Sequence, residues 1–416
     1  MHLLYIALDC PLPANNGLRL RTSTVLRALR AQGCSVTLVC LQTTAALPDA
    51  AALHEICDVY WMLEQKAGSM SGGGHAGARL RSLLSPLPYA ACRFRSLAAR
   101  KLLRQLCTGA SWDAIVCDTV YAAINLPFGM HPLIVNHHNL EHRIFDTYCQ
   151  TEPAAWKRAA AAWESRKTRR WEIAVGRRTS LNWVCSRVDR DGLVQQQPGA
   201  TVEVVPNVAP AMTAPELAEE DGLVVFQGAL DWLPNRDAVQ YFLTAIWPRV
   251  RTAQPNARLL VVGRNPPAAF VARHQCEPQV SFTGTVAETA PYLARAALTV
   301  APLRMGSGTR LKILEAAAMG KPTVATPLGA EGLEFRPGTE ILLAAAPEPF
   351  AAAVVHLLAS PALRRRMGAA ARSRVAADYD FAALCRSVQA GLRGLPGPAA
   401  SATHAPAFVL GRGAGG

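Results

Sequence analysis

The stretch APLRMGSGTRLKILEAAAMGKPTVATPLGAEGLEF, residues 301–335, has the pattern of a strand end, a glycine loop and a helix start. Residues 300–301 close an apolar run typical of a buried strand, MGSGT is too flexible for a helix or strand, and residues 310–319 are strong helix formers. A helix that begins after residues 306–308 points unpaired backbone N–H groups at the space in front of it, where its dipole favours an anion. The stretch therefore predicts a phosphate-binding turn in an α/β protein.

Three charged side chains accompany this turn. Arg310 and Lys312 add positive charge beside it, and Glu315 falls about one and a half turns into the helix, near enough to bond a hydroxylated group next to the phosphate. A nucleotide or sugar phosphate held at both ends fits this pattern. The alternative is a helix with a glycine-rich start, surface cations and one solvated glutamate. Generic phosphate motifs do not decide between them, because MGSGTRLK matches neither G-x-x-x-x-G-K-S/T nor G-x-G-x-x-G.

The segment GSGTRLKILEAAAMGKPTVATPLGAEGLE resembles the donor site of the retaining glycosyltransferases of family 4, of the type found in exopolysaccharide and cell-envelope sugar transfer. This large GT-B group transfers sugars from nucleotide-sugar donors. The resemblance implies that Glu315 binds the donor ribose. It places the diphosphate at four loop residues: Gly306, Ser307, Gly308 and Thr309.

One position departs from the family pattern E-x-x-x-x-x-x-x-E. Counting back from Glu315, Ser307 stands in place of the first glutamate, so the residue that contacts the hydroxyl groups of the donor sugar stays open. Arg310 and Lys312 are candidates for catalytic roles. Together with the helix N-terminus, these cations can stabilise the negative charge that grows on the departing diphosphate.

Length and composition indicate a folded protein of two domains. The 416 residues are too many for one ordinary core and suit two domains of about 200 residues each. The eleven cysteines include no C-x-x-C pair, so we expect reduced core cysteines in a cytoplasmic protein. The start MHLLYIALDCPLP is typical of a first strand and not of a signal peptide, and no run reaches the ~18 apolar residues of a spanning helix.

Cations are concentrated in two stretches of a chain whose net charge is +13. Residues 79–104 hold seven Lys or Arg and no acid, and residues 156–178 hold eight against two glutamates. The second stretch also carries Trp156, Trp163 and Trp171. A basic helix with tryptophans indicates an anionic membrane surface or a lipid-phosphate acceptor. A solvated helix face with the tryptophans in the core explains the pattern equally well.

The first domain opens with a β-α-β unit. Strands at 3–8 and 35–41 flank a helix at 18–31, and this order predicts a parallel sheet. The first turn, PANNGLRL, lacks the G-x-G-x-x-G fingerprint of a plain dinucleotide site. Members of the family carry a glycine loop here that faces the donor. Gly17 fits that donor-binding place, and Arg19 can reach the same space from the acceptor side.

HHNLEH, residues 137–142, follows a short strand at 133–136 and so lies where open α/β sheets bind ligands. By resemblance to an H-N-x-E segment of the family, His138 is a catalytic candidate, and Asn139 and Glu141 are acceptor-side candidates. A metal site is the alternative, because the two outer histidines of HNLEH lie four residues apart. No third ligand is marked and H-E-x-x-H is absent, so we expect sugar contacts and no metal.

Two strands of the second domain lead to further donor-site candidates. Arg236 follows the strand at 222–229, and Gly263 and Arg264 end the strand at 259–262. By resemblance, Arg236 is the one cation available there for the donor phosphates. The glycine and arginine at the end of the second strand are expected to line the base pocket.

We therefore expect an α/β fold of GT-B architecture, with two facing Rossmann-like domains and a C-terminal helix that crosses back to the first. The expected division is an acceptor-side domain at 1–206, a nucleotide-sugar-binding domain at 207–377, the crossing helix at 378–394 and a disordered tail at 395–416.

The expected reaction moves a sugar from a nucleotide diphosphate sugar to a glycan or lipid-linked acceptor with retention, in polysaccharide or envelope biosynthesis. The expected partners are that donor, that acceptor and an anionic membrane surface, with no cofactor, no metal and no nucleic acid. We expect the protein in the cytoplasm, with the inner face of the membrane as its place of association. Two alternatives are a nucleotide-sugar epimerase of GT-B fold, which needs no acceptor, and a basic nucleic-acid-binding protein, which the charge alone supports.

Overall fold

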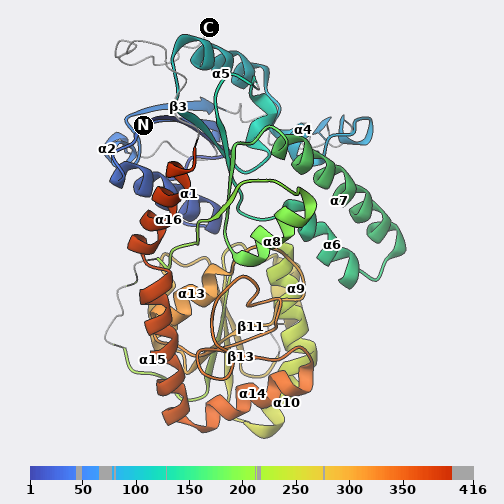
Figure 1. Cartoon of the computed structure of the whole chain (residues 1–416). Helices are drawn as coiled ribbons and strands as arrows, with labels where there is room; N and C mark the ends of the chain where they lie inside the picture. Colours follow the sequence, from blue (N-terminus) through green and yellow to red (C-terminus); the bar gives the residue numbers. More distant parts are fainter. Residues whose placement is uncertain are drawn as a thin grey trace.

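The computed structural model describes residues 1–43, 49–64, 77–78, 81–127, 129–210, 212, 217–274 and 277–395. Two α/β domains lie one above the other, each built on a parallel sheet (Figure 1). Residues 396–416 of the predicted tail lie outside the described residues, as does the glycine-rich stretch 66–76. None of the described helices is long and apolar enough to cross a membrane.

The first sheet has its strands in the order β3-β2-β1-β4-β5-β6-β7, all parallel. Its central strands are continuous buried apolar runs, which is typical of a parallel sheet covered on both faces. The strands are β1 (His2–Ala7), β2 (Ser35–Thr43), β3 (Val59–Glu64), β4 (Ala114–Asp118), β5 (Leu133–Asn136), β6 (Leu181–Val184) and β7 (Val202–Val204). The helices of this domain are α1 (Gly17–Ala31), α2 (Ala50–His54), α4 (Tyr89–Phe94), α5 (Leu97–Gly109), α6 (Glu141–Thr151), α7 (Ala155–Gly176) and α8 (Arg187–Gln196).

The second sheet has the order β10-β9-β8-β11-β12-β13, and its core includes Phe226, Phe242 and Phe350. The strands are β8 (Leu223–Gln227), β9 (Arg258–Val262), β10 (Val280–Gly284), β11 (Leu298–Ala301), β12 (Thr323–Ala325) and β13 (Leu342–Leu343). The helices are α9 (Leu233–Tyr241), α10 (Trp247–Ala253), α11 (Ala268–His274), α12 (Ala290–Arg295), α13 (Leu311–Ala318), α14 (Pro347–Ala359) and α15 (Pro361–Asp378).

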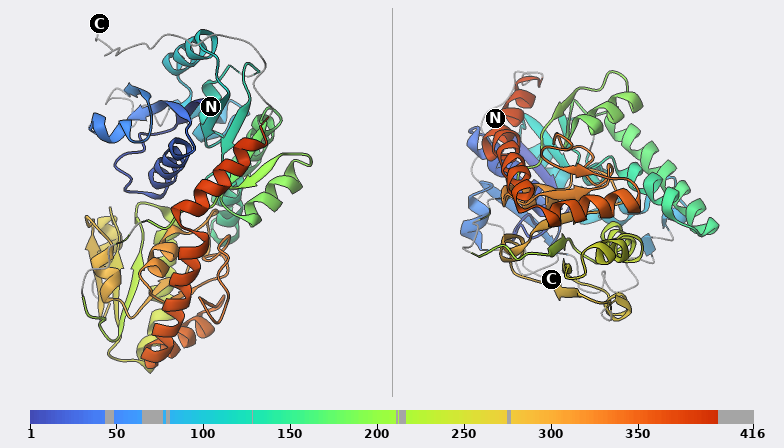
Figure 2. Two further views of the ribbon diagram at one scale, coloured as in Figure 1. Left: turned by 60° about the vertical axis from the view of Figure 1, so that its left-hand side comes forward. Right: turned by 90° about the horizontal axis from the view of Figure 1, so that it is seen from below.

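The chain passes between the sheets twice, once after β7 and once after α15. The two passages touch where the Ala209 N–H donates to the Tyr379 carbonyl at 3.0 Å. The last helix, α16 (Phe381–Arg393), then lies beside α1 and places Leu384 and Val388 in the core of the first domain. Figure 2 shows α15 and α16, in red, running from one domain to the other. The crossing helix therefore ties the two domains together.

The helix α6 next to the candidate ligand-binding edge was not predicted from the sequence. Residues Glu141–Thr151 form α6, which makes a helical hairpin with the basic helix α7 (Figure 1). Within α6 only His142 is fully buried, so the segment lacks the apolar stripe that marks a helix packed on a sheet. The hairpin instead covers the end of the first domain that faces the second.

Candidate active site

Polar residues end two central strands of the first sheet. Asp118 ends β4 and Asn136 ends β5, and both are fully buried. The carboxyl ends of parallel strands share one edge of a sheet, and open α/β sheets bind ligands at that edge. The glycine loop of the second domain, residues 305–310, meets this edge. The candidate site therefore lies between the domains.

Two glycines let the glycine loop touch the first domain. Gly306 and Gly308 have φ angles of +115° and +78°, which glycine adopts without a steric penalty. A Cβ atom on Gly308 would lie 2.2 Å from the side-chain amide of Asn139 and 2.8 Å from the carbonyl oxygen of His138. The Gly306 N–H donates to the hydroxyl of Thr147 on α6 at 2.9 Å. The structure thus brings the glycine loop into direct contact with the HHNLEH segment, and both were singled out from the sequence.

Two cations at the start of α13 are withdrawn from water, and neither has an ion pair within the described residues. Nη1 of Arg310 donates to the Ser307 carbonyl at 2.6 Å, while its Nε and Nη2 are buried and have no partner in the described part of the chain. Burial lowers the pKa of Arg310 to about 10. Nζ of Lys312 donates to the side chain of Asn235 at 2.8 Å, and burial lowers the pKa of this lysine to about 7. An anion beside these two groups would favour their charged forms.

Glu315 lies one turn further along α13. Its Oε2 accepts a hydrogen bond from Nε2 of Gln227, the last residue of β8, at 2.8 Å. Burial raises the pKa of Glu315 to about 7. A carboxylate has more acceptor sites than this one bond uses, so it can also accept from a ligand hydroxyl.

The chain segments that follow β8 and β9 approach each other closely. A Cβ atom on Gly263 would lie 2.4 Å from the Gly228 carbonyl oxygen, so only glycine fits there. Arg264 has a buried Nε without a partner in the described residues, which leaves it a donor for a ligand. Arg236 donates through Nη1 to two carbonyl oxygens of the loop after β8, at 3.0 and 3.1 Å. This arginine holds the loop, and its contact with donor phosphates stays a prediction.

The remaining predicted residues lie around the edge of the first sheet. A Cβ atom on Gly17 would lie 3.2 Å from the side chain of the first residue of α13, so this turn faces the second domain. Arg19 is buried and forms an ion pair with Asp9 at 2.8 Å. Burial, together with the charge of Glu172, raises the pKa of Glu141 to about 8. Of Gly17, Arg19 and Glu141, the contact with the second domain that is described here is that of Gly17.

The sequence analysis missed the polar network around His138. Asp118 accepts hydrogen bonds at 2.8 Å from each of three side chains: His138, Asn136 and Tyr5. Asn136 in turn accepts two hydrogen bonds from Arg21 of α1, at 2.7 and 3.1 Å. Burial alone would raise the pKa of Asp118, but His138 and the hydroxyl donors hold it below its usual range. A polar residue that closes an apolar strand, as in AIVCD and LIVN, was the signal available in the sequence.

The two histidines that suggested a metal site face different carboxylates. His138 Nε2 lies 2.8 Å from Asp118, and His142 Nδ1 lies 2.6 Å from Glu172. Within the residues that the structure describes, no group of three or more His, Cys, Asp or Glu side chains could hold a metal ion. Each histidine thus serves a separate carboxylate, and the pair does not converge on one point.

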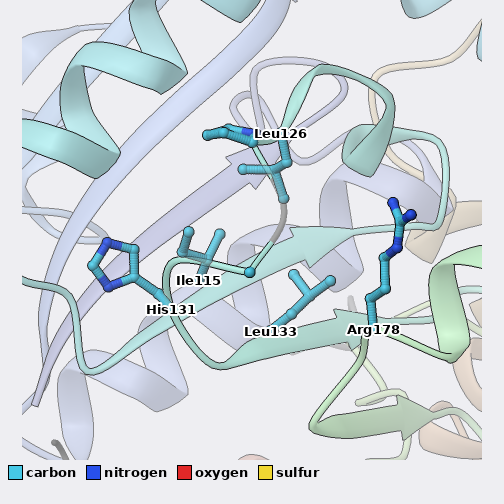
Figure 3. Close-up of a pocket in the computed structure, with 7 residues that line it drawn as sticks. Ile115, Leu126, His131, Leu133 and Arg178 are labelled. Carbon is cyan, nitrogen blue, oxygen red and sulfur yellow. The ribbon is translucent and has the colours of Figure 1, made fainter.

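A hollow of about 570 Å³ lies elsewhere, near the amino ends of β4 and β5 (Figure 3). Ile115 and Leu133 line it from these strands, and His131 and Arg178 flank them. It contains none of the predicted site residues. The candidate active site is instead formed at the carboxyl ends of the same strands, where the second domain makes contact.

The sequence of the second domain identifies the class of protein. Residues 221–360, which span β8 to α14 and include the glycine loop, match the family model described as Glycosyl transferases group 1. The chain is a glycosyltransferase. No curated protein matches the sequence.

Solved structures show the fold of this glycosyltransferase. It is similar to sucrose-phosphate synthase from Thermosynechococcus elongatus, with a TM-score of 0.71 and 17% identity over 95% of this chain and 99% of that one. It is similar to Anabaena HepE in complex with UDP and glucose, with a TM-score of 0.62 and 15% identity over 94% and 99%. It is also similar to WaaG, a glycosyltransferase involved in lipopolysaccharide biosynthesis, with a TM-score of 0.64 and 15% identity over 94% and 99%. The expected GT-B fold is confirmed, and neither the epimerase nor the nucleic-acid-binding alternative is favoured.

Proposed function

We propose that this glycosyltransferase moves a sugar from a nucleotide diphosphate sugar to a glycan or lipid-linked acceptor, with retention, in polysaccharide or envelope biosynthesis. One observation carries the proposal. Arg310 has two buried nitrogens without a partner in the described residues, next to a glycine loop and a helix start. A diphosphate is a ligand that would satisfy all three features at once.

Each end of the donor has a group of the right chemistry. Glu315 keeps acceptor capacity for the ribose hydroxyls, and Arg264 keeps a buried donor beside the expected base pocket. We assign the diphosphate to Lys312 and Arg310. HepE, which shares the fold, has been solved with UDP-glucose and with UDP, and these complexes support the same class of donor here.

The chemistry we propose is electrostatic. As the bond between sugar and diphosphate breaks, negative charge grows on the diphosphate, and the two partly desolvated cations of α13 stabilise it more strongly than water would. The resemblance of the segment around Glu315 to retaining enzymes supports retention. The same cations supply the positive charge that a metal ion would otherwise bring, so we propose transfer without a metal.

Ser307 is our candidate for donor-sugar recognition. Its Oγ is buried and has no partner among the described residues, and it stands where the family pattern has a glutamate. Oriented to satisfy its contacts, the Asn139 amide donates to the Ser307 carbonyl at 2.8 Å. A hydroxyl and an amide therefore take the place of one carboxylate, which favours a different set of sugar hydroxyls.

We propose an anionic membrane surface as the place where the acceptor is met. Trp156 and Trp163 of α7 are 72% and 50% exposed, and Arg170 follows seven residues later on the same face. Trp171 is turned inward, where its Nε1 donates to the Val120 carbonyl at 3.0 Å. One tryptophan thus belongs to the core, and two are exposed beside cations, as contact with a membrane surface would require.

A second segment adds apolar groups next to this helix face. Lys167 Nζ donates to the Ser82 carbonyl at 3.1 Å, so the segment before α4 lies beside α7, as in Figure 1. Leu83 and Leu84, which follow directly, are 73% and 82% exposed. Exposed leucines and tryptophans among cations suit the interface of an anionic bilayer.

Thermal unfolding with a panel of nucleoside diphosphates and their sugars tests the proposal. A ligand that binds only the folded state raises the melting temperature, so at least one nucleotide should do so well above the others. The best ligand then identifies the radiolabelled donor for a transfer assay on membrane extracts. A panel in which no nucleotide shifts the melting temperature at millimolar concentration would contradict the proposed donor class.

A further inference from the structure

Arg21 is a buried arginine of α1 that forms no ion pair within the described part of the chain. Its Nε and Nη2 donate to Oδ1 of Asn136 at 3.1 and 2.7 Å. Its Nη1 donates to the Val205 carbonyl at 2.9 Å and to Oδ1 of Asn207 at 3.1 Å. A guanidinium can only donate hydrogen bonds. Both asparagines must therefore turn their oxygens toward Arg21 and their NH2 groups away from it.

The first consequence reaches the second domain. Asn207 lies in the linker after β7, and its NH2 group donates to Oγ1 of Thr309 in the glycine loop. Because this oxygen is the acceptor, the hydroxyl hydrogen of Thr309 points elsewhere, and no described residue accepts it. The hydroxyl is thereby left as a donor at the place where the diphosphate is proposed.

The other contact of Arg21 ends at Asp118. The NH2 group of Asn136 donates to Oδ1 of Asp118 at 2.8 Å, and the same oxygen lies 2.8 Å from Nε2 of His138. An ionised carboxylate only accepts, so Asp118 by itself makes Nε2 of His138 the donor. The orienting effect of Arg21 on the site therefore acts through Asn207.

We propose that Arg21 is a positioning residue that sets the direction of the hydrogen bonds between the linker and the glycine loop. Through Asn207 it makes Thr309 a donor to the diphosphate. Arginine suits this role because its rigid fork holds both asparagines at once, which a lysine ammonium cannot do. The inference rests on the proposed function, since it takes a diphosphate as the ligand of the glycine loop.

The variant Asn207→Asp reverses the hydrogen bond between residue 207 and Thr309 while the side chain keeps its size. An aspartate can still pair with Arg21, but it only accepts, so Thr309 must donate to it and no longer to the diphosphate. Titration calorimetry with uridine diphosphate, and in parallel with inorganic pyrophosphate, should show roughly ten- to a hundred-fold weaker binding. The melting temperature of the unliganded variant should not fall, because the contact with Arg21 is kept.

The added negative charge could by itself repel a diphosphate, and variants of Thr309 separate this effect. Thr309→Val should weaken uridine diphosphate binding by a similar factor without adding charge. Thr309→Ser, which keeps the hydroxyl, should bind nearly as tightly as the wild type. In the Thr309→Val background, Asn207→Asp should weaken uridine diphosphate binding little further, because the hydroxyl that it redirects is absent. An equal loss in both backgrounds would show plain repulsion and overturn the inference.

The variant Arg21→Lys tests whether Arg21 sets the direction of the hydrogen bond between Asn207 and Thr309. It keeps the charge but loses the fork, so it should weaken uridine diphosphate binding when Thr309 is present and have little effect when valine replaces it. Such coupling between two side chains that do not touch would not arise from a merely structural role. Independent effects of the two variants would contradict the inference alone, whereas a wild-type protein that binds neither probe would contradict the proposed function first.

Discussion

Gly308 of the second domain lies so close to Asn139 of the first that a Cβ atom on it would stand 2.2 Å from the Asn139 amide. The two residues are far apart in the sequence, yet their contact joins the two segments that the sequence associates with the donor and with the transferred sugar. The two domains are therefore closed around the site at this point.

Gly308→Ala should reduce the transfer rate at least tenfold while leaving the protein folded. A methyl group would collide with Asn139, and a non-glycine residue at a positive φ adds strain of about 1–2 kcal/mol. Steady-state kinetics and a melting curve measure the two effects. Gly338→Ala is the matched control, because Gly338 has nearly the same φ, +79°, with nothing within 4 Å of its Cβ position. If both variants lose equal activity, backbone strain and not the contact would be responsible.

Glu315→Ala should weaken binding of the nucleotide sugar strongly and leave the fold intact. The loss of a charged hydrogen bond to the ribose costs about 1.5–3 kcal/mol. Calorimetry on the folded variant measures the dissociation constant. Glu315→Gln keeps the length of the side chain but not its charge, so its dissociation constant should lie between those of the wild type and Glu315→Ala. An unchanged dissociation constant in both variants would show that Glu315 is not part of the site.

Arg310→Ala and Lys312→Ala should each lower kcat more than they raise KM. The partner charge of these cations increases as the diphosphate leaves, so their stabilisation is larger in the transition state than in the ground state. Initial rates over a range of donor concentrations give both parameters. A change in KM with kcat intact would show that the cations bind donor and transition state equally.

Diphosphate binding should weaken as the pH rises above about 7. The folded-state pKa of Lys312 is lowered to about 7 from its ordinary 10.5, so above pH 7 the free protein holds this lysine mainly neutral. Binding an anion favours the charged form and takes up a proton, so the affinity falls by up to about tenfold per pH unit above that value.

Calorimetry in two buffers of different ionisation enthalpy measures this proton uptake directly. Lys312→Met should bind the nucleotide more weakly at pH 7 and show little further decline between pH 7 and pH 9. Below pH 7 the lysine is charged and contributes no slope. An affinity that is flat from pH 7 to 9 in the wild type would contradict a desolvated Lys312.

The protein should float with anionic phosphatidylglycerol vesicles at low salt and much less at high salt. Each cation near an anionic surface contributes about 1 kcal/mol, and salt screens this attraction as the Debye length shortens. Replacing Arg166 and Arg170, on the exposed face of α7, with glutamate should weaken flotation. Trp156→Ala with Trp163→Ala should weaken it without a change in charge.

The matched control for the charge reversal is Arg365→Glu with Arg366→Glu. These two exposed arginines lie on α15 of the second domain, so the net charge changes equally while the proposed membrane face does not. Flotation of this control should equal that of the wild type. Absence of the wild-type protein from anionic and neutral vesicles alike at low salt would refute the membrane hypothesis.

Much of the fold was predictable because its signals are local. Buried strands of a parallel sheet are continuous apolar runs, and an apolar run followed by MGSGT and by helix formers specifies strand, loop and helix without reference to the rest of the chain. The helix α6 was missed for the complementary reason: it packs against α7 and the glycine loop and not on a sheet, so only one of its residues is fully buried.

The sequence by itself brought together the residues that we propose for the donor side, because Gly306 to Glu315 are contiguous and their spacing alone sets which groups share one helix start. Only the tertiary structure decided what His138 faces. Its carboxylate partner Asp118 comes from another strand, and Arg21 and Asn207, which orient the surrounding hydrogen bonds, come from a helix and a linker that are distant in sequence. The direction of a hydrogen bond depends on every donor and acceptor around it, and these groups meet only when the parallel strands align their carboxyl ends.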